Sequence, residues 1–254
     1  MKNVITLGIL LFALMLTSCG DRPANLRTSP TMLSVDPTPA SSSFPPTSTS
    51  ISSSKAIEVN LVKEDDSIRA IGMHSDGRLL VKPASKASVA SLGAPSCYGL
   101  ETDLNWSGEY EVVWESKSQG TPIKVMTFPA DFEIVQQNDS PIIMQQFSLG
   151  DTDIFTYVPR YTDCHGLETY LFGVNKGKAF SISFEMKPEQ IWKNISQLPH
   201  RPFKVANGEL ILTGGYGAGQ DFIDVYHFHY DPKKRSMILQ STDQVKPNDF
   251  VYGQ

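Results

Sequence analysis

Two short segments carry the residue types that enzymes use for nucleophilic or metal-dependent chemistry. Segment 163–167 reads Asp-Cys-His-Gly-Leu and places the thiol of Cys164 beside the imidazole of His165. Segment 226–230 reads Tyr-His-Phe-His-Tyr, so His227 and His229 are two residues apart. A cysteine becomes a nucleophile where its thiolate is favoured, and two imidazoles on one face can chelate a metal ion. These are the two chemistries that the sequence offers.

The cysteine segment is similar to the Asp-Cys-Ser-Gly nucleophile motif of the NlpC-like cell-wall cysteine peptidases. The resemblance implies a thiolate at Cys164, placed at a helix amino terminus, with a downstream histidine as base, here His227 or His229. The chain departs from the motif because His165 replaces the serine, and because residues 169–174 read as a strand without a helix dipole. A cell-wall cysteine hydrolase is therefore the alternative function, and we expect that the domain is not an enzyme.

The amino-terminal residues predict export. Lys2 precedes an apolar run over residues 4–16, which is too short for a confident membrane-spanning helix. The following Leu-Thr-Ser-Cys, ending at Cys19, resembles the lipobox of bacterial lipoproteins. The resemblance implies cleavage of a signal peptide over residues 1–18 and attachment of diacylglycerol to Cys19. Two or more acyl chains make a firm anchor, so the partner implied here is the membrane.

Residues 19–54 are expected to form a disordered tether after the lipidated cysteine. Of the 33 residues from 22 to 54, Ser, Thr and Pro account for 21, which leaves too little apolar surface to offset the entropy of ordering. A long tether suits a protein on the extracytoplasmic face of the cell membrane, and it favours a Gram-positive owner. The 200 residues from 55 to 254 are expected to form one globular domain.

The remaining cysteines allow one pair. If Cys19 carries lipid, only Cys97 and Cys164 remain in an exported domain, and oxidising surroundings permit a disulfide between them. The sequence leaves a disulfide and free thiols as alternatives, because only the spatial distance between the two residues decides.

Metal binding and ligand binding have candidate residues of their own. Strand alternation would put His227 and His229 on one face, but Asp224 has the wrong parity to complete a metal site there. We therefore expect no cofactor. Aromatic residues that could be presented to a polymer or protein are Tyr216 in the glycine-rich segment 213–221, Tyr226 and Trp192.

Period-two patterns predict an all-β domain. Short runs rich in β-branched and aromatic residues predict strands at 57–62, 109–115, 123–128, 132–136, 142–147, 153–158, 169–174, 179–186, 209–213, 223–230 and 236–240. Asp76-Gly77, residues 175–177 and Asn207-Gly208 predict tight turns. A single helix is predicted over residues 188–198. The expected fold is an antiparallel sandwich or irregular barrel, with a small propeller less favoured.

The net charge of the chain limits the kinds of partner that it can attract. The chain has 22 basic and 27 acidic side chains, a net charge of −5, and no basic block. Nucleic acid and anionic polymers are thus disfavoured as broad electrostatic partners. Together these features predict a lipid-anchored cell-surface protein that acts as a binding or interaction module in the envelope, with a cell-wall polymer or an envelope protein as its partner.

Overall fold

A computed structural model describes residues 62–118 and 120–247. This part of the chain is all-β, with eighteen strands and no α-helix. The predicted signal peptide, Cys19, the tether and the predicted strand at 57–62, apart from Val62, lie outside the described residues. Within the described part, no helix is both long and apolar enough to cross a membrane.

The first sheet contains seven strands from the amino-terminal half of the described chain. Its order is β5-β4-β3-β2-β7, with β1 paired to β3 and β6 paired to β4. The long strands β3 and β4 are its centre, because each pairs with different neighbours along its two halves. The strands are β1 (Lys63–Asp65), β2 (Ala70–His74), β3 (Gly77–Ser91), β4 (Leu104–Ser116), β5 (Ile123–Thr127), β6 (Phe132–Gln136) and β7 (Ile142–Ile143).

The second sheet contains eleven strands in the order β15-β16-β17-β18-β12-β11-β9-β8, with β10 and β14 paired to β11 and β13 paired to β12. Most pairs are antiparallel, but β12 and β18 run parallel. Its strands are β8 (Gln145–Leu149), β9 (Thr152–Tyr157), β10 (Tyr161–Asp163), β11 (Gly166–Asn175), β12 (Lys178–Lys187), β13 (Gln190–Trp192), β14 (Ile195–Gln197), β15 (Lys204–Ala206), β16 (Glu209–Thr213), β17 (Ile223–Asp231) and β18 (Ser236–Val245).

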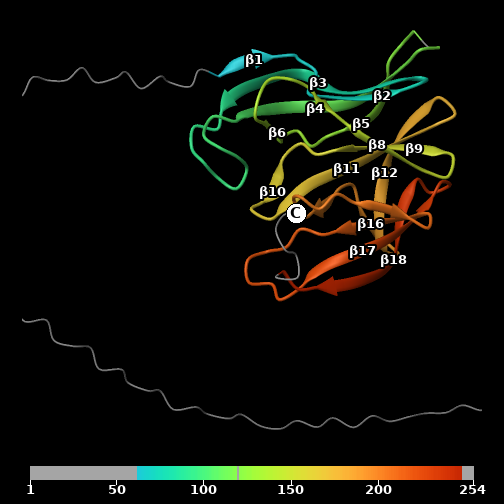
Figure 1. Ribbon diagram of the computed structural model, residues 1–254. Helices are drawn as coiled ribbons and strands as arrows, with labels where there is room; N and C mark the ends of the chain where they lie inside the picture. Colours follow the sequence, from blue (N-terminus) through green and yellow to red (C-terminus); the bar gives the residue numbers. More distant parts are fainter. Residues whose placement is uncertain (1–61, 119, 248–254) are drawn as a thin grey trace, which may run out of the picture. The chain divides into compact units, whose positions relative to one another are not determined.

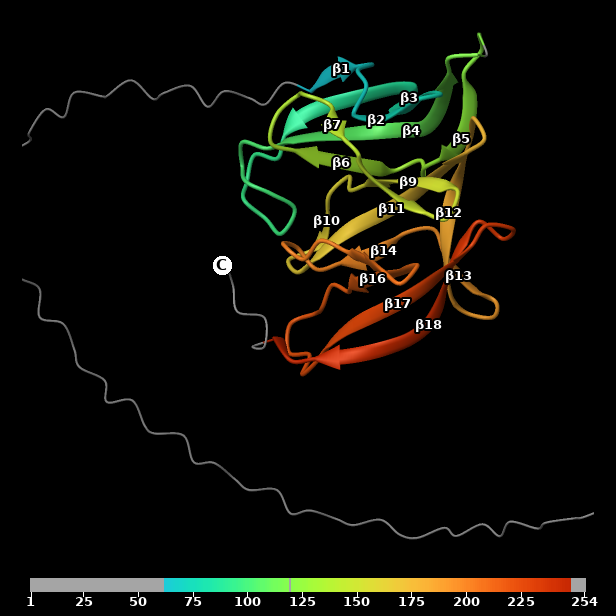
Figure 2. The same ribbon diagram turned by 45° about the vertical axis from the view of Figure 1, so that its right-hand side comes forward.

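Strands β9 and β11 separate two hydrophobic cores. In Figure 1 and Figure 2 they lie between the β3–β4 pair and the β17–β18 pair. Phe155 and Phe172 face the core shared with the first sheet, whereas Ile154 and Leu171 face the core enclosed by the second sheet. Because successive side chains of a strand point to opposite faces, a strand with a core on each side reads as a continuous apolar run. This explains why segment 169–174 is apolar almost throughout.

All three predicted turns close hairpins. Ser75 and Asp76 join β2 to β3, one residue earlier than predicted, with Gly77 as the first residue of β3; Lys176 and Gly177 join β11 to β12, and Asn207 and Gly208 join β15 to β16. The last two turns have positive φ at both central residues, 49° and 72° in one and 53° and 79° in the other. This is the backbone that two-residue hairpins prefer, because it matches the twist of the flanking strands.

The predicted helix over residues 188–198 is wrong. The segment forms β13 and β14, which pair with β12 and β11. Ile195 is buried at 2% exposure, whereas Ile191 is 61% exposed, so these residues do not share one apolar helical face. A helix of this length is marginal on its own, and pairing with two existing strands satisfies the same backbone groups.

The predicted strand at 142–147 is divided. Residues 142–143 form β7 beside β2 in the first sheet, and residues 145–149 form β8 beside β9 in the second. Met144 lies between them, is 5% exposed, and donates its backbone N–H to the carbonyl of Ile71. The chain changes sheets at this residue because its side chain fills the core between the sheets.

Candidate functional site

The two domain cysteines form a disulfide. Cys97 lies in the β3–β4 loop, Cys164 lies in the β10–β11 turn, and their Cα atoms are 4.4 Å apart. Strand β11 follows Cys164, so no helix dipole acts on its sulfur. A disulfide sulfur is not a thiolate nucleophile, and Cys164 could attack a substrate only after reduction. Both cysteines are exposed, which makes the bridge accessible to reductants.

His227 and His229 share one face of β17, as the alternation predicts, while Phe228 and Tyr230 are buried on the other face. The Nε2 atom of His227 lies 3.0 Å from the Oδ2 atom of Asp243, and its Nδ1 atom lies 3.8 Å from the Oε2 atom of Glu209. We call His227, His229, Glu209 and Asp243 the histidine face. No group of three or more potential metal ligands was found in the described residues.

The predicted aromatic residues lie apart from one another. Tyr216 places its ring 4.6 Å from the ring of His165, next to the disulfide-bearing turn. Tyr226 is half-buried on β17 and donates its hydroxyl to Asp224 over 3.4 Å. Trp192 lies on β13 opposite Phe184 and is 37% exposed. The sequence thus identified accessible aromatic side chains, but the structure does not gather them into one site.

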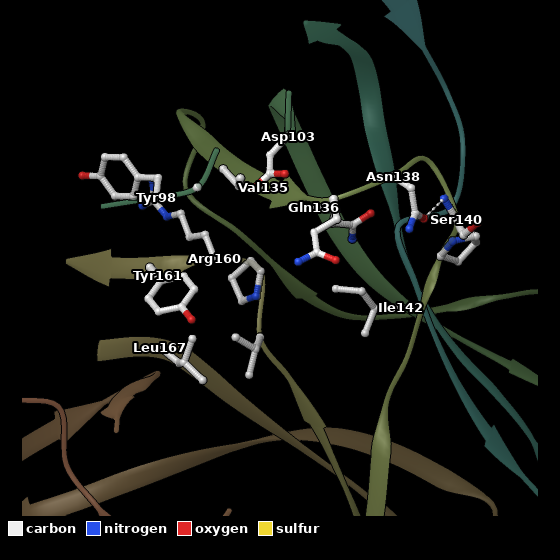
Figure 3. Close-up of a pocket in the computed structure, with 15 residues that line it drawn as sticks. Tyr98, Asp103, Val135, Gln136, Asn138, Ser140, Ile142, Arg160, Tyr161 and Leu167 are labelled. Carbon is white, nitrogen blue, oxygen red and sulfur yellow. Dashed lines mark hydrogen bonds between the residues drawn. The ribbon is translucent and has the colours of Figure 1, made fainter. Parts of the chain in front are cut away.

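A cavity of about 470 Å³ lies beside the disulfide. Three segments build it: the β3–β4 loop that Cys97 anchors, the end of β6 with the segment leading to β7, and the chain from the end of β9 to β11. Figure 3 shows Tyr98, Arg160 and Tyr161 at one end, Asn138, Ser140 and Ile142 at the other, and the Gln136 amide between them. The lining residues are Tyr98, Gly99, Asp103, Val135, Gln136, Gln137, Asn138, Ser140, Pro141, Ile142, Val158, Pro159, Arg160, Tyr161 and Leu167.

The charges around the cavity are engaged by protein groups. The Nη1 atom of Arg160 donates to Glu133 over 2.8 Å, and its Nε atom donates to the buried Glu168 over 3.1 Å. The guanidinium also faces the ring of Tyr98, 5.8 Å from its centre. Asp103 accepts the backbone N–H of Leu100 over 2.9 Å. With one cation and three carboxylates, this end of the cavity does not attract anions.

Neutral polar groups form the opposite wall. Gln136 is 8% exposed, and its amide donates to the carbonyl of Arg69 over 3.1 Å. The Nη2 atom of Arg69 in turn donates to the carbonyl of Asp139 over 2.8 Å, and the side chain of Asn138 accepts the N–H of Ser140 over 3.0 Å. These bonds hold the segment between β6 and β7 in one conformation, so the wall is largely pre-formed.

The sequence reasoning missed this cavity. Its aromatic and cationic residues flank the cysteines in the chain, because Tyr98 follows Cys97 directly and Arg160 lies four residues before Cys164. A disulfide between the cysteines necessarily brings these neighbours together. The Cys97–Cys164 pairing was thus the one signal that could have found the site.

A second constellation that the sequence did not suggest combines a serine, a histidine and an aspartate. The Nε2 atom of His74 lies 3.0 Å from Asp153, and the Oγ atom of Ser75 lies 3.5 Å from its Nδ1 atom. The backbone N–H of Asp76 donates to the same Nδ1 atom over 3.0 Å, so that nitrogen already serves as an acceptor. Ser75 donates to Asp76 instead. The histidine therefore connects β2 to β9 across the two sheets and does not activate the serine.

No protein-family model matches the chain, and neither a curated protein nor a solved structure matches it.

Proposed function

We propose that the protein is a lipid-anchored binding module of the bacterial cell surface that holds a segment of an uncharged cell-wall polysaccharide in the cavity beside the disulfide. The observation that carries the proposal is the cavity itself, with tyrosines at one end and the buried amide of Gln136 in its wall. Ligand sites are typically concave, and a few fixed polar groups orient the ligand in them.

The lining chemistry favours a neutral, hydroxyl-rich ligand. The rings of Tyr98 and Tyr161 offer flat apolar surfaces that also carry hydroxyl groups, and Gln136, Gln137 and Asn138 offer both donors and acceptors. Sugar rings present C–H faces and hydroxyl groups that match this combination. Because Arg160 is already paired with Glu133 and Glu168, it has little attraction left for the phosphates of an anionic wall polymer.

The sequence supports the location. The lipobox-like segment ending at Cys19 and the Ser/Thr/Pro-rich tether would fix the domain to the outer face of the membrane, within reach of the wall. The net charge of −5 is consistent with a neutral rather than an anionic partner. A Cys19→Ser variant is expected to lose acylation and to leave the membrane fraction. Retention of that variant in membranes would contradict the anchor.

Binding is tested with purified cell-wall polysaccharide from which teichoic acid and peptides have been removed. The purified full-length protein is expected to bind this polymer, and Tyr161→Ala is expected to weaken binding by about fivefold or more, because truncating an aromatic contact that anchors a ligand typically costs more than about 1 kcal/mol. Trp192→Ala is the matched control, since Trp192 is exposed but does not line the cavity.

Three outcomes would refute the proposal: no binding to the polysaccharide, equal loss of binding in both variants, or binding that requires teichoic acid. The last result would assign an anionic ligand to the protein.

A further inference from the structure

Arg69 is a buried cation without a carboxylate partner. It directly precedes β2, is 2% exposed, and its guanidinium lies 4.2 Å from the ring centre of Trp106. Its hydrogen bonds go to neutral acceptors, the carbonyl of Asp139 and the side chain of Gln136. It forms no ion pair with any carboxylate among the described residues. A buried charge is costly unless an opposite charge lies beside it.

The carboxylate that acts on Arg69 from a distance is Asp65. Burial disfavours ionisation of Asp65, but hydrogen bonds from Ser67 and Trp106 and the charge of Arg69 hold its pKa below the usual value. The Oδ2 atom of Asp65 accepts the indole N–H of Trp106 over 3.0 Å. Asp65 therefore accepts from the indole N–H and forms no ion pair with the guanidinium of Arg69.

Within the described part of the chain, one atom of this cation and two tyrosine hydroxyl groups are buried without hydrogen-bond partners. The Nε atom of Arg69 and the hydroxyl oxygens of Tyr110 and Tyr157 find no hydrogen-bond partner among the described residues. Both tyrosines are 0% exposed, and they come from different sheets, Tyr110 from β4 and Tyr157 from β9. Each unsatisfied buried group costs about 1–3 kcal/mol, so three of them in one core need an explanation.

The three side chains occupy one region of the core between the sheets. All belong to or border the same hydrophobic cluster, and Trp106, on which Arg69 packs, is a member of it. Burial raises the pKa of Tyr110 to about 12, and the charge of Arg69 opposes this rise. Burial also raises the pKa of Tyr157; Tyr110, Tyr170 and Glu168 add to this rise, and Arg69 opposes it.

Among the described polar groups of this core, only Arg69 carries a charge that no neighbouring carboxylate pairs with. Tyr170 donates its hydroxyl to Glu168, and Glu168 also pairs with Arg160, so these groups satisfy one another. The atoms that remain open are an N–H and two O–H groups, all of which can donate. A water molecule can accept from the N–H of Arg69 and donate to a phenolic oxygen, but it leaves the charge of Arg69 without a counter-ion. A halide ion accepts from all three and offsets the charge of Arg69.

We propose that Arg69, Tyr110 and Tyr157 bind a small monovalent anion such as chloride between the two sheets. The anion completes the hydrogen bonding of Arg69, and Arg69 holds Gln136 and the Asp139 carbonyl in the wall of the cavity. The site is therefore distinct from the polysaccharide site but supports its wall. It does not depend on the proposed function.

Thermal unfolding of the purified full-length protein tests the proposal. Sodium chloride or bromide is compared with sodium gluconate at equal ionic strength, because gluconate is too large for a buried site. Binding to the folded state alone raises Tm with anion concentration, by roughly 3–5 °C for each tenfold increase above Kd in a domain of this size. Crystals soaked in bromide are expected to show an anomalous peak beside Arg69. Equal Tm in chloride and gluconate would overturn the proposal.

Tyr157→Phe removes one donor and keeps the ring. The variant is expected to lose most of the chloride-dependent rise in Tm, and Tyr110→Phe is expected to behave in the same way. Tyr226→Phe is the matched control, because its hydroxyl is bonded to Asp224 in the other core, and it is expected to keep the full rise. If Tyr157→Phe instead raises Tm equally in all salts, the hydroxyl is simply unsatisfied and the anion site is refuted. If both Tyr157→Phe and Tyr110→Phe keep the full chloride-dependent rise in Tm, the anion site is also refuted.

Discussion

The cavity beside the disulfide is built from three segments that are distant in the sequence, whereas the histidine face comes from the three successive strands β16–β18. The cavity is concave, and its charges are paired within the protein. The histidine face lies on a sheet surface where His229 is exposed and Asp243 is 70% exposed. A period-two pattern shows which side chains share a face of a strand, but it does not show whether that face is hollow.

The two regions differ in what holds them together. At the cavity, side-chain bonds and one disulfide add to the few backbone bonds that join the three segments, such as Val135 N–H to the carbonyl of Pro159. On the histidine face, backbone pairing of β16, β17 and β18 continues whatever the side chains are. Stability and binding should therefore respond strongly to changes near the cavity and weakly to changes on the histidine face.

The largest effect is expected from removal of the disulfide. The bridge closes a loop of 67 residues, which in the chain-entropy model corresponds to about 4 kcal/mol of stability. The Cys97→Ser/Cys164→Ser double variant is expected to lose roughly this amount in urea unfolding, and also most of its polysaccharide binding, because the Tyr98 loop loses its anchor. Reduction of the wild type should reproduce both effects. Full binding by the double variant would show that the bridge does not shape the cavity.

The next effect concerns Arg160. Replacement by Met keeps the aliphatic stem but leaves Glu168 buried without its cation, which is expected to lower the free energy of unfolding by roughly 2–3 kcal/mol. Binding should also fall, since Arg160 lines the cavity. Arg78→Met is the matched control: its bond to Glu115 is short at 2.6 Å, but the two side chains are 49% and 30% exposed, so a loss below about 1 kcal/mol is expected. Equal losses in both variants would argue against a special role for the cavity pair.

Alkaline pH should distinguish the two cores. Burial raises the pKa of Tyr110 to about 12, above its unfolded value near 10. The folded state then retains a proton that the unfolded state releases, so this stability is fully present below pH 10 and is lost as pH rises towards 12. The slope is at most about 1.4 kcal/mol per pH unit for each phenol. Tyr110→Phe is expected to reduce the slope more than Tyr226→Phe, because Tyr226 is only half-buried. Equal slopes in the two variants would contradict this difference.

The sequence predicted the fold better than the site, for a physical reason. Strands at 132–136 and 209–213 were predicted with their observed bounds, because each alternates regularly between a core and a more accessible face. The helix over 188–198 and the undivided strand at 142–147 were wrong, since each segment contains a strand that pairs with one distant in the sequence, β14 with β11 and β7 with β2. The cavity depends on such long-range contacts throughout. Only the cysteines marked its place, and the buried Arg69 gives no local signal at all.

The smallest effect on stability and binding is expected from changes on the histidine face. The His227→Ala/His229→Ala double variant loses the bond from His227 to Asp243, whose side chain is 70% exposed, so a change within about 1 kcal/mol is expected. Polysaccharide binding should be unchanged, and addition of Zn²⁺ should not raise Tm of the wild type, because no third ligand completes the pair in the described residues. A zinc-dependent rise in Tm that the double variant abolishes would restore the metal hypothesis. A loss of binding would move the ligand from the cavity to the sheet surface and reverse the comparison.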